Sequence, residues 1–91
     1  MLKIAGKVIQ VGNIIERGEK RFKTAEFVIE TDEKYPQKIK FDLLGDKTDM
    51  LKHLSIGKKI DVHFNLKGKE YNDKFYNSLE CYKFEAESKP F

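Results

Sequence analysis

The stretch from Lys67 to Asn77, "KGKEYNDKFYN", carries three lysines and three aromatic residues around the pair Asn72–Asp73. Asn and Asp tolerate the backbone of tight turns, so the stretch predicts a hairpin tip. Ammonium groups bind phosphate as point charges, and aromatic rings stack on flat ligands. Because nearby acids offset most of the lysine charge, the location of the hairpin and an outward Tyr71 must decide whether it binds a flat, anionic ligand or is only a turn.

Residues that could support catalysis are scarce. The sequence has no nucleophile elbow, phosphate-binding glycine loop or metal-binding carboxylate pair. Asp46 and Asp49 fall at the start of a predicted helix, where capping and the helix dipole explain them. The single cysteine, Cys81, has apolar neighbours and is predicted to be a buried core thiol, and neither His53 nor His63 has a cysteine at zinc-finger spacing. We expect no enzymatic activity, no metal and no cofactor.

Length and composition limit the chain to a single small domain. Its 91 residues are 40% hydrophobic and 36% charged, with a net charge of +3. Because the net charge is small, a polyanion could bind only through a local patch of positively charged side chains. No apolar run reaches the length of a membrane span, and no signal-peptide pattern is present. We expect a domain over residues 1–86, a tail over residues 87–91, no membrane partner, and a reducing cytoplasm.

Alternation of apolar and polar residues predicts three strands in the first half of the chain. The first begins near Ile4 and loses its phase before Gly12, which indicates a bulge or a bend. After a polar connection over residues 13–21, Phe22–Glu30 and Gln37–Leu44 form the second and third strands. Each has one apolar and one polar face, as in a sheet with one buried side.

One segment changes to helical spacing. The stretch over residues 45–57 predicts a helix of about two to three turns, with Asp46 or Thr48 as N-cap and Gly57 as stop signal. Its apolar face consists of Met50, Leu51 and Leu54.

The last two predicted strands cover residues 59–67 and 75–85. The first of them points its apolar residues inward as far as Leu66. In the other, Leu79 and Cys81 share one face, while Tyr76, Tyr82 and Phe84 share the opposite one. Either Phe75 or Tyr76 is expected in the core.

Three strands, a helix and two strands are the element order of an OB-fold, a five-stranded, partly open Greek-key barrel. We therefore predict an all-β protein with one short helix between strands three and four. An SH3-like barrel is the main alternative, but it normally lacks this helix.

OB barrels bind oligonucleotides on the face of strands two and three, between the connections one–two and four–five. Cations there would follow the phosphates, and aromatic rings would stack on bases at about 1–3 kcal/mol each. The chain places these residues there: Arg17, Lys20, Arg21, Phe22, Lys23, Lys38, Lys40, Lys67, Lys69, Tyr71, Lys74, Phe75 and Tyr76. The pattern predicts sequence-tolerant binding of a single strand. The alternative is a plain surface on which lysines keep strand edges soluble.

Short motifs also resemble known families. "KVIQVGNI", residues 7–14, resembles the opening strand of bacterial single-stranded DNA-binding proteins (SSBs), and "KIKFDLLGDKTDML", residues 38–51, is similar to their third strand and helix. "EFVIETDEKYPQKIKFDLLGDK", residues 26–47, and "FYNSLECYKFE", residues 75–85, more closely resemble a small, uncharacterised family of OB-type proteins from bacteria and phages. The resemblance implies single-stranded DNA binding in replication, recombination or repair, and assembly into dimers or tetramers.

Two features qualify what the resemblance implies. The chain has no tryptophan, so base stacking would rest on Phe22, Tyr71, a further hairpin aromatic and Tyr82, with weaker and more salt-dependent binding. The end of the chain, "EAESKPF", resembles the acidic SSB tail tip that ends in Pro-Phe, although Lys89 departs from it. It implies that Pro90 and Phe91 dock replication proteins. A protein-interaction subunit of a replication assembly and a single-stranded RNA binder remain the alternative functions.

Overall fold

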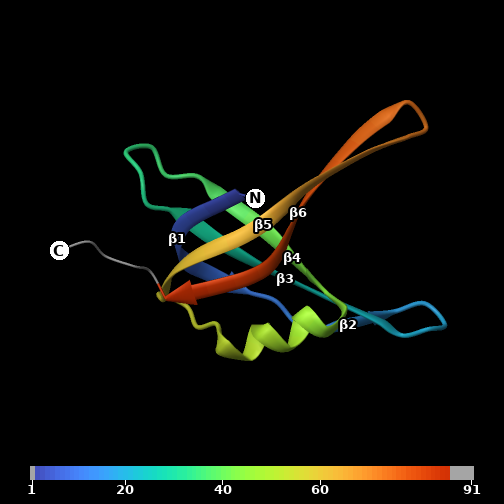
Figure 1. The fold of residues 1–91 in the computed structure, drawn as a ribbon, viewed down its shortest axis with the longest axis horizontal. Helices are drawn as coiled ribbons and strands as arrows, with labels where there is room; N and C mark the ends of the chain where they lie inside the picture. Colours follow the sequence, from blue (N-terminus) through green and yellow to red (C-terminus); the bar gives the residue numbers. More distant parts are fainter. Residues whose placement is uncertain (1, 87–91) are drawn as a thin grey trace.

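The computed structural model describes residues 2–86, which form six strands and one 3-10 helix (Figure 1). The elements are β1 (Leu2–Val11), β2 (Ile15–Arg17), β3 (Phe22–Thr31), β4 (Lys38–Leu44), η1 (Gly45–His53), β5 (Lys59–Tyr71) and β6 (Lys74–Ala86). Across this range, no helix combines the length and the apolar character that crossing a membrane would need.

The strands close into a barrel. Their order in the sheet is β1-β5-β6-β4-β3-β2, and β1 also pairs with β3. The barrel closes between β4 and β6, which run parallel where Asp42 lies opposite Glu80. Strand β1 pairs with both β5 and β3, and the helix η1 lies between β4 and β5. This is the predicted OB-fold, so the prediction is confirmed.

Gly6 lies where β1 passes from one partner strand to the other. It is opposite Thr31 of β3 and opposite Ile60 of β5. A Cβ atom at this position would lie 2.8 Å from the backbone oxygen of Glu30, closer than side-chain carbons approach. The closure of the barrel therefore requires glycine here.

The core forms from the faces that alternation marks as apolar. Phe27 and Phe41 stack with ring centroids 5.5 Å apart, and Phe64 meets Phe41 edge-on at 5.1 Å. Met50 and Leu51 of η1 pack against this cluster and Leu54 is buried in it, as the helical spacing predicts. The largest fully buried side chains are Phe27, Phe41, Ile29, Leu43, Ile60, Val8, Val62 and Thr48.

The helix differs from its prediction at both ends. It is a 3-10 helix that begins at Gly45 after Leu44, with no side-chain cap, so Asp46 and Thr48 are not N-caps. Thr48 is buried and donates its hydroxyl hydrogen to the Gly45 carbonyl at 2.8 Å instead. The helix stops at His53, before Gly57.

Two bulges explain where the alternation lost its phase. The β1–β3 register shifts between Val8 and Gln10, which accounts for the ambiguity before Gly12. A second shift, between His63 and Phe64 of β5, brings Phe84 into contact with the core, with its ring 6.3 Å from that of Phe27. The prediction that Phe84 and Cys81 lie on opposite faces was therefore wrong, because the extra residue, Tyr82, reverses the alternation between them.

Candidate nucleic-acid interface

Strands β5 and β6 continue past the barrel as a long two-stranded hairpin (Figure 1). Their antiparallel register is unbroken from Phe64 opposite Cys81 to Tyr71 opposite Lys74. The turn consists of Asn72 and Asp73 with φ of 52° and 62°, the positive values that a two-residue hairpin turn of type I′ requires. The hairpin predicted from "KGKEYNDKFYN" is confirmed.

The hairpin has two chemically different faces, because side chains alternate along each strand and cross-strand partners share a face. One face, called here the tyrosine face, consists of Lys67, Lys69, Tyr71, Lys74 and Tyr76. The other, called the apolar face, carries Leu66, Phe75 and Leu79 beside Glu70 and Asn77. The lysines and tyrosines of the hairpin are thus on one side of the ribbon, and Phe75 is on the other.

Most of these aromatic side chains are exposed to solvent. Tyr71 is 64% exposed and Phe75 78%, and Tyr76 is also largely accessible at 47%. The expectation that Phe75 or Tyr76 enters the core was wrong, as was the inward position of Leu66, which is 60% exposed. The physical reason is that the hairpin leaves the barrel before these residues, so neither face meets a second layer.

A second hairpin, β2–β3, projects on the same side of the barrel (Figure 1). The segment predicted as a polar connection contains the short strand β2, in which Arg17 lies opposite Phe22 and Ile15 opposite Thr24. Arg17 donates from Nε to the Thr24 hydroxyl at 3.4 Å. These four side chains share one face of the ribbon.

Four surface hollows join the two hairpins into one path, called here the track. The first is lined by Ile15, Arg17, Glu26 and Asp42, and the second by Glu26, Lys40, Asp42, Leu66 and Leu79. The second and third share Asn77 and Ser78, and the third and fourth share Lys69 and Tyr76. Neighbouring hollows therefore share lining residues from Arg17 on β2 to Tyr71 near the hairpin tip, and at Asn77 and Ser78 the path passes from the apolar face of the hairpin to the tyrosine face.

The middle of the track is acidic. Glu26 lies opposite Asp42, and Asp42 lies opposite Glu80, so three neighbouring strands form a carboxylate row. Lys40 Nζ pairs with Glu26 at 3.2 Å. Burial raises the pKa of Asp42, and the charges of Glu26 and Glu80 raise it further, whereas Lys40 opposes them. The row makes the centre of the track unfavourable for phosphate.

The structure brings together only part of the predicted set. The track or its rims contain Arg17, Phe22, Lys40, Lys67, Lys69, Tyr71, Lys74 and Tyr76. Lys20 and Arg21 lie in the β2–β3 turn, Lys23 points to the other face of that ribbon opposite Glu16, and Lys38 lies opposite Glu30 at the far end of β4. Phe75 is on the apolar face of the hairpin.

Sequence reasoning missed the carboxylate row. Alternation put Glu26 and Asp42 on the outer faces of their strands, but it does not show that they are cross-strand neighbours. Glu80 joins them only through the parallel crossing of β4 and β6, whose position depends on barrel closure. The only sequence signal for this row was the presence of acidic residues on the outer face of each strand, which a count of both charge signs would have included.

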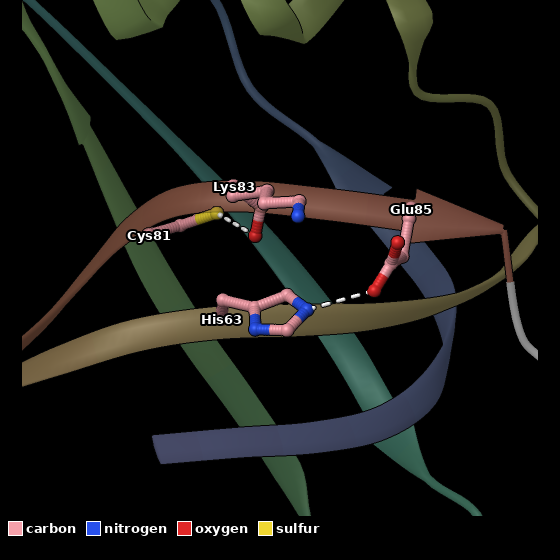
Figure 2. Close-up of polar contacts among 4 residues, drawn as sticks. All are labelled: His63, Cys81, Lys83 and Glu85. Atoms are coloured by element: carbon pink, nitrogen blue, oxygen red, sulfur yellow. Dashed lines mark hydrogen bonds and ion pairs between the residues drawn. The ribbon is translucent and has the colours of Figure 1, made fainter. Parts of the chain in front are cut away.

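Other polar groups lie away from the track, at the opposite end of β5 and β6 (Figure 2). His63 Nε2 lies 2.9 Å from Glu85 Oε1, and this hydrogen bond lowers the pKa of Glu85. The part-buried Tyr82 has its ring centroid 6.3 Å from that of His63, which places it in this cluster. The buried Cys81 thiol donates to the Lys83 carbonyl at 3.5 Å, and burial raises its pKa to about 11, so the predicted core thiol is confirmed.

Two further predictions concern the C-terminal tail and metal binding. Pro90 and Phe91 lie outside the described residues. Within residues 2–86, no group of three or more histidine, cysteine or acidic side chains is arranged to hold a metal ion.

Solved structures with a similar fold include single-stranded DNA-binding proteins. The SSB domain of a Synechococcus sp. protein superposes with a TM-score of 0.72 and 13% identity, over 91% of this chain and 90% of that one. The dimeric N-terminal domain of PriB from Thermoanaerobacter tencongensis gives 0.67 and 12%, over 97% and 96%. A deletion mutant of the Thermus aquaticus single-stranded DNA-binding protein gives 0.72 and 11%, over 98% of this chain but only 41% of that protein. The fold is SSB-like.

Comparison by sequence gives one family. The model described as "Domain of unknown function (DUF3127)" matches residues 3–85. No curated protein matches the chain by sequence.

Proposed function

We propose that this chain, which belongs to the family described as domain of unknown function DUF3127, binds single-stranded DNA without catalysing a reaction on it. The observation that carries the proposal is the tyrosine face, where three lysines and two exposed tyrosines share one side of a projecting hairpin. Exposed aromatic side chains grouped with cations are uncommon on a surface that has no partner. The SSB-like fold of the barrel supports the same ligand class.

The track suits a flexible strand more than a duplex. Lys67, Lys69 and Lys74 would neutralise phosphates, and the rings of Tyr71 and Tyr76 would stack on bases. Stacking needs unpaired bases with free faces, which a duplex does not offer. Because every base has such a face, binding by these contacts does not depend on a sequence motif.

The biological setting follows from the ligand. We place the protein among those that protect or guide single strands during DNA replication, recombination or repair, in the cytoplasm of a bacterium or of a phage-infected cell. It would act as a dimer or tetramer. One of the similar structures, the PriB domain, is dimeric.

Tyrosine fluorescence tests the proposal directly, because the chain has four tyrosines and no tryptophan. We expect a mixed-sequence single strand to quench part of this emission at low salt. Replacing Tyr71 and Tyr76 together by Phe should remove the quenching but keep the affinity, measured by anisotropy of a labelled strand, because phenyl rings also stack. Tyr35→Phe, far from the track in the turn after β3, is the matched control and should leave the quenching in place. Binding of a strand without quenching in the wild type would overturn the placement on the tyrosine face.

A second candidate function rests on the apolar face. Leu66 and Phe75 are 60% and 78% exposed, and such side chains also serve as anchors in protein interfaces. In that case the chain is an interaction subunit of a replication assembly. The wild type would then not bind a single strand but would capture a specific protein. Phe75→Ala would abolish this capture. If single-stranded RNA competes more strongly than DNA, the ligand is RNA instead.

A further inference from the structure

The middle of the track combines an apolar wall with carboxylate hydrogen-bond acceptors, an arrangement that fits the flat ring and the polar edge of a nucleobase. Leu66 and Leu79 form an apolar wall, and Leu66 remains 60% exposed. Glu26 and Asp42 line the same hollow. A phosphate would be repelled by the carboxylates, and an aliphatic group would leave them without hydrogen-bond partners.

From this juxtaposition we infer that the hollow between Leu66 and the carboxylates of Glu26 and Asp42 holds bases edge-on and favours those that carry an amino group over thymine or uracil. The inference rests on the proposed function, because it concerns how a bound single strand lies in the track. The carboxylate row is not a binding site by itself. The row determines which part of the bound DNA strand faces the carboxylates at the bottom of the hollow, while the tyrosine face binds the neighbouring nucleotides.

The hydrogen-bond chemistry determines the direction of the preference. Ionised carboxylates only accept hydrogen bonds. Cytosine presents the N4 amino group as a donor, and Asp or Glu is its usual partner, whereas thymine presents the O4 acceptor at the same position. An acceptor facing a carboxylate is repelled, and an amino group facing it is bound.

The charges around the hollow leave the carboxylates able to accept. Lys40 engages Glu26 at 3.2 Å, and both side chains stay more than half exposed, at 61% and 56%. Asp42 has no salt-bridge partner among the pairs that residues 2–86 form. Glu80 lies next to it across the β4–β6 crossing and repels phosphate from the same place. Phosphates are therefore directed to the lysines of the tyrosine face and to Arg17, and base edges to the floor.

Oligo-dC and oligo-deoxyuridine of about 15 nucleotides give the sharpest comparison. Both are pyrimidine strands of equal charge, and uracil lacks the methyl group that complicates thymine. At slightly alkaline pH, where cytosine is neutral, we expect the wild type to bind oligo-dC about fivefold more tightly or better, which is the lower range for one good base contact. Asp42→Asn should bring the ratio toward one, mainly by strengthening oligo-deoxyuridine binding, because an amide also donates.

A matched variant separates local contacts from net charge. Asp32→Asn changes the charge by the same amount at an exposed position just after the far end of β3, and should leave the ratio unchanged. Equal affinity of the wild type for the two strands, or a ratio that Asp42→Asn and Glu26→Gln do not alter, overturns this inference alone. If the wild type binds neither strand, the proposed function fails as well, so the two failures are distinguishable.

Discussion

Glu26 of β3 and Asp42 of β4 lie directly opposite each other in the antiparallel register, so two carboxylates occupy the centre of the surface that joins the two hairpins. Like charges at directly opposite positions destabilise a sheet. Burial raises the pKa of Asp42, and the charge of Glu26 raises it further. A surface that carries such a cost to stability is more readily explained by a ligand than by folding.

Asp42 should make the protein less stable as the pH rises from acid to neutral. Its pKa in the folded state lies above the ordinary 3.8, so the folded state keeps this proton to higher pH than the unfolded state does. The stabilisation is complete below 3.8 and is lost as the pH rises through the raised pKa. Asp42→Asn should remove this loss, and denaturant unfolding at both ends of the window measures it. An Asn variant that is less stable than the wild type at neutral pH would contradict the assignment.

Loss of stacking at the hairpin should weaken binding without changing the fold. Tyr71→Ala and Tyr76→Ala should each reduce the affinity for a single strand by about 1–3 kcal/mol, because each ring stacks on one base. Both side chains are exposed, so the thermal midpoint should change little. Tyr35→Ala is the control. If affinity stays at the wild-type value in the double Ala variant, the tip is only a turn.

The lysines of the tyrosine face should control how salt affects binding. If Lys67, Lys69, Lys74 and one further cation each neutralise a phosphate, log affinity should fall with log salt with a slope of about −2 to −3. Lys69→Ala should reduce the magnitude of that slope by about 0.7. Lys34→Ala, in the turn after β3, removes the same charge away from the track and should leave the slope unchanged. Equal effects of the two substitutions would show that only net charge matters.

Gly6 should be essential for closing the barrel. A methyl group there would meet both the Glu30 backbone oxygen and the Cδ1 atom of the buried Ile29 at 2.8 Å, and the backbone atom cannot move aside as a flexible side chain would. Gly6→Ala should therefore destabilise the protein by about 1–3 kcal/mol, which lowers the thermal midpoint by several degrees. Gly68→Ala, also in a strand, meets only the flexible Asn77 side chain at 3.3 Å and should have little effect. Similar midpoints for the two variants would refute this role for Gly6.

The fold was predictable from the sequence because the outer and inner faces of each strand differ in polarity. Phe27 and Phe41 lie in the core on the faces that alternation marks as apolar, and the helix was located by its change of period. The position of Phe84 was not predictable, since a bulge inserts one residue without any mark in the sequence. The exposure of Leu66 depends on where the hairpin leaves the barrel, which local pattern does not reveal.

The candidate interface was predictable only in part. Register in the last hairpin follows from its two-residue turn, which fixes that Lys69 and Tyr76 share a face. The carboxylate row instead depends on pairings between strands distant in the sequence, such as Asp42 with Glu80. Long-range register is set by closure of the whole barrel, so a single sequence does not show which outer residues become neighbours.

The central claim is that the track binds unpaired DNA through phosphate neutralisation and base stacking. The most direct measurement is an anisotropy titration of a labelled single strand of about 15 nucleotides at two salt concentrations, with an unlabelled duplex of equal length as competitor. The account predicts saturable binding that weakens steeply at the higher salt, and a duplex that competes poorly. Affinity that is insensitive to salt, or a duplex that competes as well as the single strand, would contradict it.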